Sequence, residues 1–384
     1  MRDCKPKPLK VSWLSSANNL SLVIPTYNRP SHLQRLLTYF DKQNVNYEIL
    51  VPDSSSDEIK ASNEKIISTF SKLRINHLDQ FSSETNFYHK IAQTVDFLDM
   101  KYTVLCADDD YITPKALDQS IAFLEKNSDY TAVGGYYLSF LTKVNRSNKK
   151  KFYWKEYLSS INQIKAYASL TSSDPKSRLI SHLSFYIPTL YYVHETNFLR
   201  MIQKESLPYI KELNFAASFG ELLLDMLTII YGKIKTLDIF YGARESVPTT
   251  KVLYSKYAGV IKPIKDGTYN YYYGKFKNCL VKHLSQEGGI SDQESNNVID
   301  QGMNFYLKRS IGNISSSRIK QLFRSFRRSV YFFQINLTQY RMISLRKQID
   351  LRKWNLNDPP SKYLGEFKQI RNSVLTENYG RETG

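Results

Sequence analysis

Residues 20–135 alternate short apolar runs rich in β-forming residues with segments of helical periodicity, and this alternation constrains the fold more than any other feature. The runs expected as strands cover 20–24, 47–51, 73–78 and 102–106. The segment after the first run places Leu33, Leu36 and Phe40 on one face of a helix. Strands that alternate with such helices form a mostly parallel sheet with crossover helices. The sequence therefore predicts an α/β fold.

The rest of the sequence predicts further elements and a change of composition near residue 250. Residues 141–180 are polar and rich in Lys and Ser, and we interpret them as an excursion or flap outside the core. Later segments predict a strand at 185–193, a buried helix at 221–231 and a strand at 233–241. We divide the chain into an N-terminal extension at 1–19, an α/β domain at 20–250 and a basic, mainly helical region at 251–384.

The charge balance indicates an anionic partner. Lys and Arg together number 53 against 36 Asp and Glu, which gives a formal net charge of +17. Nucleic acid, acidic lipid and phosphorylated small molecules all fit this excess. The three cysteines are far apart and lack zinc-site spacing, so we expect reduced thiols at Cys4, Cys106 and Cys279. The start lacks a signal sequence and we find no uninterrupted apolar run of roughly 18 to 20 residues, so we expect a cytoplasmic protein.

Residues that follow strands are the candidates for a binding site, because ligands of open α/β sheets bind at the carboxyl ends of the strands. These residues are the loop 25–29, Asp53 and the three consecutive carboxylates Asp108, Asp109 and Asp110. Adjacent carboxylates repel one another unless they are solvated or neutralised, and Mg²⁺ or Mn²⁺ prefers such oxygen ligands. An exposed acidic turn before the helix that opens at Pro114 is the alternative.

Three of these segments resemble motifs of the family 2 glycosyltransferases, which have the GT-A fold. The pentapeptide Pro-Thr-Tyr-Asn-Arg stands at 25–29, a turn similar to the family's second motif stands at 51–57, and an Asp-rich element stands at 107–110. Pro52 and Ser54 depart from the family pattern, and Ser54 replaces a glycine that reaches positive φ easily. The resemblance implies an enzyme of the kind that builds bacterial surface polysaccharides, which transfers a sugar from a nucleotide-sugar donor with inversion.

The resemblance also implies roles for individual residues. Pro25, Thr26, Tyr27 and Arg29 would line the nucleoside pocket, and Asp53 would contact the base, which we expect to be uracil. Asp108 and Asp109 would bind the donor, with Mn²⁺ or Mg²⁺ held by Asp109 and Asp110.

Four further residues complete the candidate site. Glu221 has the spacing from Gly232 that the family's catalytic base has from a glycine, so it would remove the proton of an acceptor hydroxyl. Lys90 and Arg244 are candidate phosphate contacts, although a solvated lysine and a surface ion pair are alternatives. Asp225 lies one helical turn after Glu221 and either assists it or pairs with a buried cation. The roles of His182 and His194 stay open.

The segment 318–333 has an apolar stripe opposite several arginines, as in a basic amphipathic helix. It would either bind an anionic membrane at the inner face of the cytoplasmic membrane, near a lipid-linked glycan acceptor, or pack against the α/β domain or a second copy of the chain. Two other function classes compete with the glycosyltransferase: a catalytically silent sugar-binding or scaffold module, and a basic nucleic-acid-binding protein. We disfavour nucleic acid, because the sequence has no recognised motif for it.

Overall fold

The computed structural model of the chain describes residues 19–144, 150–156, 169–246, 259–312, 356 and 363–375. The elements of the first half are β1 (Leu20–Val23), α1 (Pro30–Lys42), β2 (Glu48–Pro52), α2 (Asp57–Ser68), β3 (Arg74–Leu78), α3 (Phe87–Thr94), η1 (Val95–Phe97), β4 (Tyr102–Leu105), β5 (Asp110–Ile112), α4 (Pro114–Lys126), β6 (Tyr130–Val144) and β7 (Lys150–Glu156). Those of the second half are α6 (Pro175–Ser184), β8 (Val193–Glu195), α7 (Thr196–Ile210), α8 (Leu213–Phe215), η2 (Ala216–Gly220), α9 (Glu221–Tyr231), β9 (Lys233–Glu245), α10 (Ile261–Asp266), α11 (Tyr269–Gly288), α12 (Asp292–Gly312) and α14 (Leu364–Leu375).

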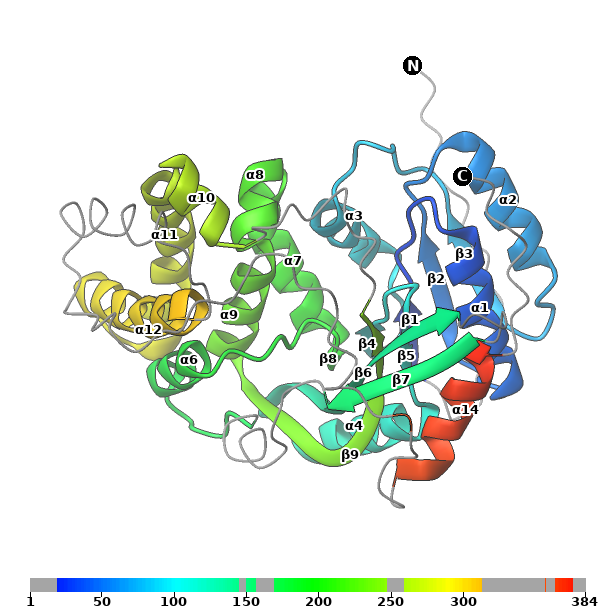
Figure 1. Cartoon of the computed structure of the whole chain (residues 1–384). Coiled ribbons are helices and arrows are strands. Elements are labelled where there is room, and N and C mark those ends of the chain that lie inside the picture. The colour runs from blue at the N-terminus through cyan, green and yellow to red at the C-terminus, as the bar shows by residue number, and fades with distance from the viewer. Residues whose placement is uncertain are drawn as a thin grey trace.

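The described strands form one mixed, mostly parallel sheet in the order β3-β2-β1-β4-β8-β6-β9-β5, with β7 paired to β6 (Figure 1). Strands β1 to β4 are parallel to one another, and β6 is parallel to β9. The short strands β8 and β5 run antiparallel to their neighbours. The predicted α/β fold with a mostly parallel sheet is confirmed, because the four N-terminal strands lie where their apolar runs predicted them.

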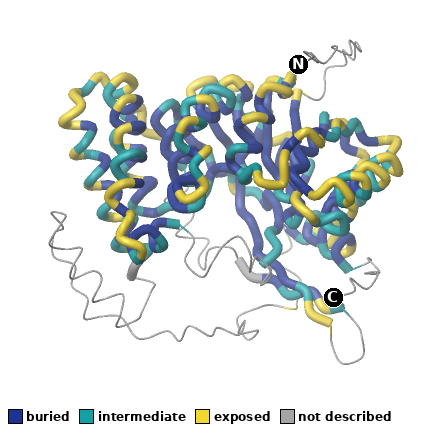
Figure 2. Tube along the Cα trace, turned by 90° about the horizontal axis from the view of Figure 1, so that it is seen from above, coloured by how far each residue is buried: buried dark blue, intermediate teal, exposed yellow. Residues whose placement is uncertain are grey.

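Helices cover both faces of the sheet, and the strand side chains divide between two hydrophobic clusters. Val23, Leu50 and Leu105 belong to the cluster shared with α3, α7, α9 and α11, while their strand neighbours Leu22 and Val104 belong to the cluster shared with α1, α4 and α14. Alternate residues of a strand point to opposite faces, so runs that are apolar throughout indicate a sheet buried on both sides. Figure 2 shows this buried interior in dark blue beneath an exposed shell of helices.

Two predictions for the middle of the chain are wrong. The strand predicted at 185–193 is limited to β8, because the backbone before it forms a turn: Tyr192 N–H donates to Thr189 O at 2.9 Å, and Thr189 N–H donates to the Asp225 side chain. At residues 141–144 and 150–156 the predicted excursion or flap is not found, since β6 continues to Val144 and pairs with β7. Phe152 and Trp154 of β7 are buried.

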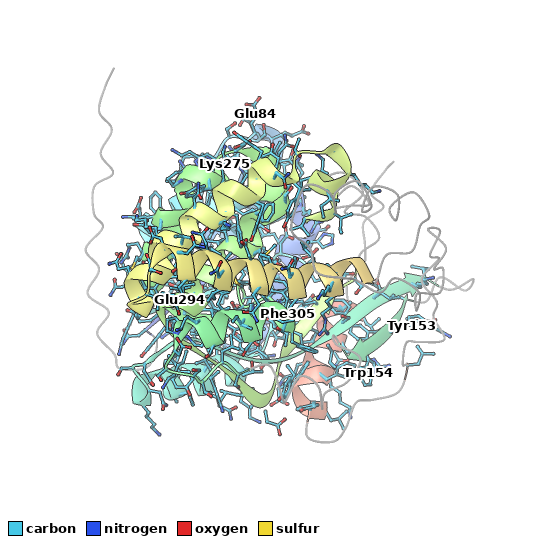
Figure 3. All side chains as sticks on the ribbon, turned by 90° about the vertical axis from the view of Figure 1, so that its left-hand side faces the viewer. Glu84, Tyr153, Trp154, Lys275, Glu294 and Phe305 are labelled. Atoms are coloured by element: carbon cyan, nitrogen blue, oxygen red, sulfur yellow. The ribbon has the colours of Figure 1, made fainter. Side chains whose placement is uncertain are left out.

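The basic region after residue 250 packs against the α/β part of the chain on both faces. Side chains of α10, α11 and α12 belong to the same hydrophobic cluster as α6, α7 and α9. Helix α14 returns to the opposite face, where Phe367 contacts Phe152 and Trp154 edge-on at ring distances of 5.6 and 5.8 Å. Figure 3 shows Trp154 beside this helix and Phe305 on α12. The segment 318–333 lies outside the described residues.

The continuous helix Leu213–Tyr231, which joins α8, η2 and α9, is the one described helix long and apolar enough to cross a membrane, by length and composition. Its most apolar window is 78% buried inside the protein, as is usual for a core helix. The turn η2 is π-helical and ends immediately before Glu221. Such turns change the direction in which the following side chains point.

Candidate active site

The loop after β1 and the turn after β2 lie side by side at the carboxyl end of the sheet. Thr26 N–H donates to Pro52 O at 3.1 Å, and Ser54 N–H donates to Thr26 O at 3.3 Å. The sheet pairing therefore continues past both strands, and it fixes the two predicted nucleoside-binding segments against each other.

Asn28 completes this connection from a left-handed conformation with φ of 53°. Its backbone N–H donates to Ser55 Oγ at 2.8 Å, and its side-chain oxygen accepts from Ser56 N–H at 3.0 Å. Asparagine is one of the few non-glycine residues that adopts this conformation readily. Ser54, in contrast, has no positive φ, so the turn does not need the glycine found there in the family pattern.

Asp53 is fully buried, and both of its oxygens accept hydrogen bonds from the protein. Oδ1 accepts from Ser55 N–H at 2.8 Å, while Oδ2 accepts from Asn63 Nδ2 at 2.7 Å and lies 3.1 Å from His77 Nε2. Burial alone raises the pKa of this carboxyl, but the hydrogen bonds from His77, Asn63 and Ser55 outweigh it and lower the pKa to about 2. Asp53 therefore holds the turn, and its contact with a base stays a prediction.

Lys90 also points inward and is buried. Its Nζ donates to Thr26 O at 2.6 Å and to Ser54 Oγ at 2.9 Å, so it links the loop after β1 to the turn after β2. Burial lowers the pKa of Lys90 to about 8, although the charges of Asp108 and Asp53 oppose the shift. The solvated-lysine alternative is wrong. Lys90 supports the loop that would hold a donor, and its contact with phosphate stays a prediction.

Arg29 joins the first two carboxylates of the acidic triplet. Its Nη1 lies 3.2 Å from Asp108 Oδ1 and 2.7 Å from Asp109 Oδ2, and Thr26 Oγ1 donates to Asp108 Oδ2 at 2.8 Å. Burial and the charge of Asp109 raise the pKa of Asp108 to about 6, against the effect of Arg29 and Thr26. The structure therefore brings the Pro25–Arg29 loop and the triplet together, as predicted.

Asp110 begins β5 and points toward β9. Its Oδ1 accepts from Glu245 N–H at 3.3 Å, and its Oδ2 lies 3.8 Å from Arg244 Nε. The Arg244 guanidinium lies between the rings of Tyr137 and Tyr191, at 4.2 and 4.6 Å from their centroids. A cation enclosed by two aromatic faces is well fixed in position. Arg244 is therefore half-buried beside the triplet, and the alternative of an ion pair on the surface is wrong.

Glu221 begins α9 and lies within the electrostatic influence of Arg244. It is half-buried, and its Oε1 accepts a hydrogen bond from the Tyr186 hydroxyl at 2.9 Å. Burial raises the pKa of Glu221, while Tyr186 and the charge of Arg244 lower it. The same Arg244 charge lowers the pKa of Asp110, which burial and Asp109 raise well above the usual range. Arg244 thus lies within electrostatic reach of both the triplet and Glu221.

Asp225 is buried one turn further along α9. It accepts from Thr189 N–H at 3.1 Å and Thr189 Oγ1 at 2.7 Å, and it also contacts the Tyr186 hydroxyl. No described Lys or Arg forms a salt bridge with it, so the predicted partnership with a buried cation is not found in the part of the chain that the structure describes.

Comparison with known proteins identifies the domain that carries this site. Residues 21–185 match the family model described as glycosyl transferase family 2. This segment is a glycosyl transferase family 2 domain. It contains the Pro25–Arg29 loop, Asp53, Lys90 and the acidic triplet, whereas Glu221 and Arg244 lie beyond it.

A solved structure of the S. aureus protein TarS shares the fold of the family 2 domain and of much of the remaining chain. TarS 1–349 in complex with UDP-GlcNAc superposes with a TM-score of 0.52 at 13% identity, covering 80% of this chain and 78% of that chain. A second structure of TarS 1–349 gives 0.49 at 14% identity with the same coverage. Likeness at this identity establishes the fold alone. No curated protein matches the sequence significantly.

The candidate site and its surroundings contain contacts that the sequence analysis missed. His77 on β3 and Asn63 on α2 both bind Asp53, and no motif marked either residue. Tyr186 lies in the segment predicted as a strand, and its contact with Glu221 was not predicted. His182 and His194 are buried, and burial lowers their pKa values to about 3 and about 4, so both rings are neutral near pH 7. His194 Nε2 lies 3.2 Å from Thr189 O, which favours a structural role.

Proposed function

We propose that this chain is a metal-dependent inverting glycosyltransferase and that its nucleotide-sugar donor is a UDP-sugar. The observation that carries the proposal is the convergence of Arg29, Asp108 and Asp109 with the loop and turn at the carboxyl ends of β1, β2 and β4. UDP-GlcNAc and UDP are the ligands of the TarS complexes that share this fold. We expect Pro25, Thr26 and Tyr27 to face the nucleoside, and Tyr27 has the exposure this requires.

The proposed metal is one divalent cation at the acidic triplet. Within the described residues no three His, Cys, Asp or Glu side chains gather into a complete metal site, so phosphate oxygens and water would have to supply most ligands. Mg²⁺ and Mn²⁺ commonly bind in this way, with one or two carboxylates. Burial and the charge of Asp109 raise the pKa values of Asp108 and Asp110, and a bound cation would favour the ionised form of both carboxyls. We assign the ion to Asp109 and Asp110, where it would stabilise charge on the departing diphosphate.

Glu221 is the proposed general base. It is half-buried rather than sealed, so an acceptor hydroxyl can reach it, and the charge of Arg244 favours its ionised form. Removal of the hydroxyl proton by Glu221 would let the oxygen attack the anomeric carbon from the face opposite the diphosphate. A single displacement of this kind inverts the anomeric configuration. Arg244 is suited to contact the leaving phosphates, since its guanidinium is fixed beside Asp110.

The proposed acceptor is a hydroxyl of a glycan or a lipid-linked glycan in surface polysaccharide synthesis. The proposed location is the cytoplasm, with peripheral binding to the inner face of the cytoplasmic membrane through 318–333. Flotation with vesicles that contain anionic lipid tests this: we expect binding that falls with added salt and is lost when the arginines of 318–333 are replaced by glutamine. Binding that is the same for both proteins contradicts it.

The first experiment is a calorimetric titration of UDP into the protein with and without Mn²⁺, repeated on Asp109→Asn. We expect metal-dependent binding that is lost in this variant and kept in the control Asp129→Asn, whose exposed carboxylate pairs with Lys233 on the surface. If UDP, GDP and CDP all fail to bind, the proposed donor site is wrong, and a nucleic-acid partner becomes the better hypothesis. If UDP binds but no UDP-sugar is hydrolysed or transferred, the chain is the silent module.

A further inference from the structure

A single tyrosine hydroxyl lies between the two acidic side chains of α9. The Tyr186 oxygen is 2.9 Å from Glu221 Oε1 and in closer contact with Asp225 Oδ2. A hydroxyl has one proton and can donate to only one of the two carboxyls. If both carboxyls were ionised, the second contact would bring two lone pairs together in a buried place. The three oxygens therefore need two protons for both contacts to be hydrogen bonds.

The structure favours Asp225 over Glu221 as the holder of the second proton. Asp225 is 1% exposed, whereas Glu221 is half-buried and lies near the positive charge of Arg244. Both Thr189 donors bind Asp225 Oδ1, which leaves Oδ2 for a proton directed at Tyr186. Burial and the charge of Glu221 raise the pKa of Asp225 to about 7. A negative charge is thus less costly on Glu221 than on Asp225.

The groups that surround the tyrosine fix its ring and add no charge. His182 of α6 and Tyr306 of α12 both meet the ring edge-on, with centroids 5.2 and 5.4 Å away. His182 is neutral, because burial lowers its pKa to about 3, and burial raises the pKa of Tyr306 to about 12. Tyr192 before β8 is also neutral, since burial raises its pKa to about 12. Among the described groups around Glu221 and Asp225, Arg244 is therefore the positively charged one, and its charge lowers the pKa of Glu221.

We infer that Asp225 and Tyr186 are positioning residues for the base: Asp225 donates its proton to the Tyr186 oxygen, and Tyr186 donates to Oε1 of ionised Glu221. This arrangement leaves Glu221 Oε2 to take the proton of the acceptor hydroxyl. The inference rests on the proposed function, in which Glu221 is the base. Loss of the Asp225 proton at higher pH would draw the hydroxyl toward Asp225 and leave Glu221 without its partner.

The variant Asp225→Asn distinguishes a positioning role of Asp225 from a role as a second catalytic base. The asparagine amide has the shape of the neutral acid, so Nδ2 can donate to Tyr186 while Oδ1 accepts from Thr189. We expect kcat within a few-fold of the native value and no decline of kcat as pH rises through the native pKa of Asp225. Glu221→Gln should lower kcat by about a hundredfold or more, because it removes the base. Loss of activity in Asp225→Asn as large as in Glu221→Gln overturns the inference.

Tyr186→Phe tests the hydroxyl itself. We expect kcat to fall by roughly tenfold, the effect of losing one hydrogen bond to a charged group, with no change in the donor Kd. Tyr231→Phe is the matched control, since it removes a hydroxyl that contacts His283 Nδ1 at the other end of α9. Equal kcat and equal pH profiles for Tyr186→Phe and the native protein contradict the inference.

A measurement independent of turnover locates the proton. In infrared difference spectra at mildly acidic pH, Asp225→Asn should lose one of the native protein's protonated carboxyl bands, and Glu221→Gln should keep that band. The reverse pattern overturns the inference. If the native protein transfers no sugar from any donor, the proposed function fails while this spectrum still decides where the proton lies.

Discussion

At the scale of single residues, the site is organised by buried polar side chains that bind one another. Asp53 receives hydrogen bonds from Ser55, Asn63 and His77, and Lys90 joins Thr26 to Ser54. Buried charges are costly unless they are paired and hydrogen-bonded. This requirement fixes the loop and the turn before any ligand binds.

The ion pair between His77 and Asp53 predicts how stability depends on pH. Burial lowers the pKa of His77, but its contact with Asp53 outweighs burial and raises the pKa above the usual value. The stabilisation is therefore complete below about 6.5 and is lost as pH rises through the raised pKa. We expect the free energy of unfolding of the native protein to fall over that interval, and that of His77→Gln to fall less, in denaturant titrations. Glu64→Gln, at an exposed partner of His77, should change the profile less than His77→Gln does, because Asp53 contributes more than Glu64 to the raised pKa of His77.

Replacing Arg29 should remove the cation shared by Asp108 and Asp109. We expect Arg29→Gln to lower the free energy of unfolding by about 1 to 3 kcal/mol, because two neighbouring carboxylates lose a charged donor. Added Mn²⁺ should restore part of the loss if the ion takes over the neutralisation. Thermal denaturation with Mn²⁺ and with a chelator measures both effects. A variant as stable as the native protein in the chelator contradicts the role given to Arg29.

At the scale of elements, the pairing of β5 with β9 places Asp110 opposite Arg244. Close contact of the two strands depends on Gly242, where an added Cβ would lie 2.0 Å from the backbone oxygen of Tyr111. A backbone oxygen cannot move aside as the end of a side chain can. The glycine therefore keeps Asp110 and Arg244 in register.

Gly242→Ala should separate the two strands and reduce donor binding together with stability. Gly274→Ala is the matched control, because an added Cβ there meets no atom within 4 Å and the residue lies inside α11. Alanine is better than glycine within a helix by about 0.5 to 1 kcal/mol, so the control should be slightly stabilised. Calorimetry with UDP and thermal denaturation measure both variants. Equal donor affinity in Gly242→Ala contradicts the prediction.

Helix α14 should stabilise the protein through its contact with β7. Phe367 is buried against Phe152 and Trp154, and removing a buried phenylalanine side chain costs about 3 to 5 kcal/mol. We expect Phe367→Ala to lower the free energy of unfolding by this amount, and the exposed neighbour Gln369→Ala to leave it unchanged, in denaturant titrations. A small effect of Phe367→Ala would show that α14 is detached from the core in solution.

At the scale of the whole molecule, helices α10 to α12 and α14 are part of the same packed structure as the α/β part. Phe276, Leu280 and Met303 belong to the cluster that also contains side chains of α9. Figure 1 shows α11 next to α9. We expect a chain that ends at residue 250 to lack cooperative thermal unfolding, because it exposes the apolar face of α9 to water. A cooperative transition of the shortened chain, followed by circular dichroism, would show instead that 20–250 folds on its own.

The sequence alone determined the α/β class, the first four strands and the residues that follow them, because apolar periodicity and turn residues act locally. It also indicated the family 2 motifs and the candidate base. The tertiary structure decided which of these side chains face inward. Asp53 and Lys90 support the loop because His77, Asn63, Thr26 and Ser54 reach them across the sheet. The Tyr186 contact with Glu221 and Asp225, and the packing of α11, α12 and α14, join segments far apart in sequence, which no local pattern encodes.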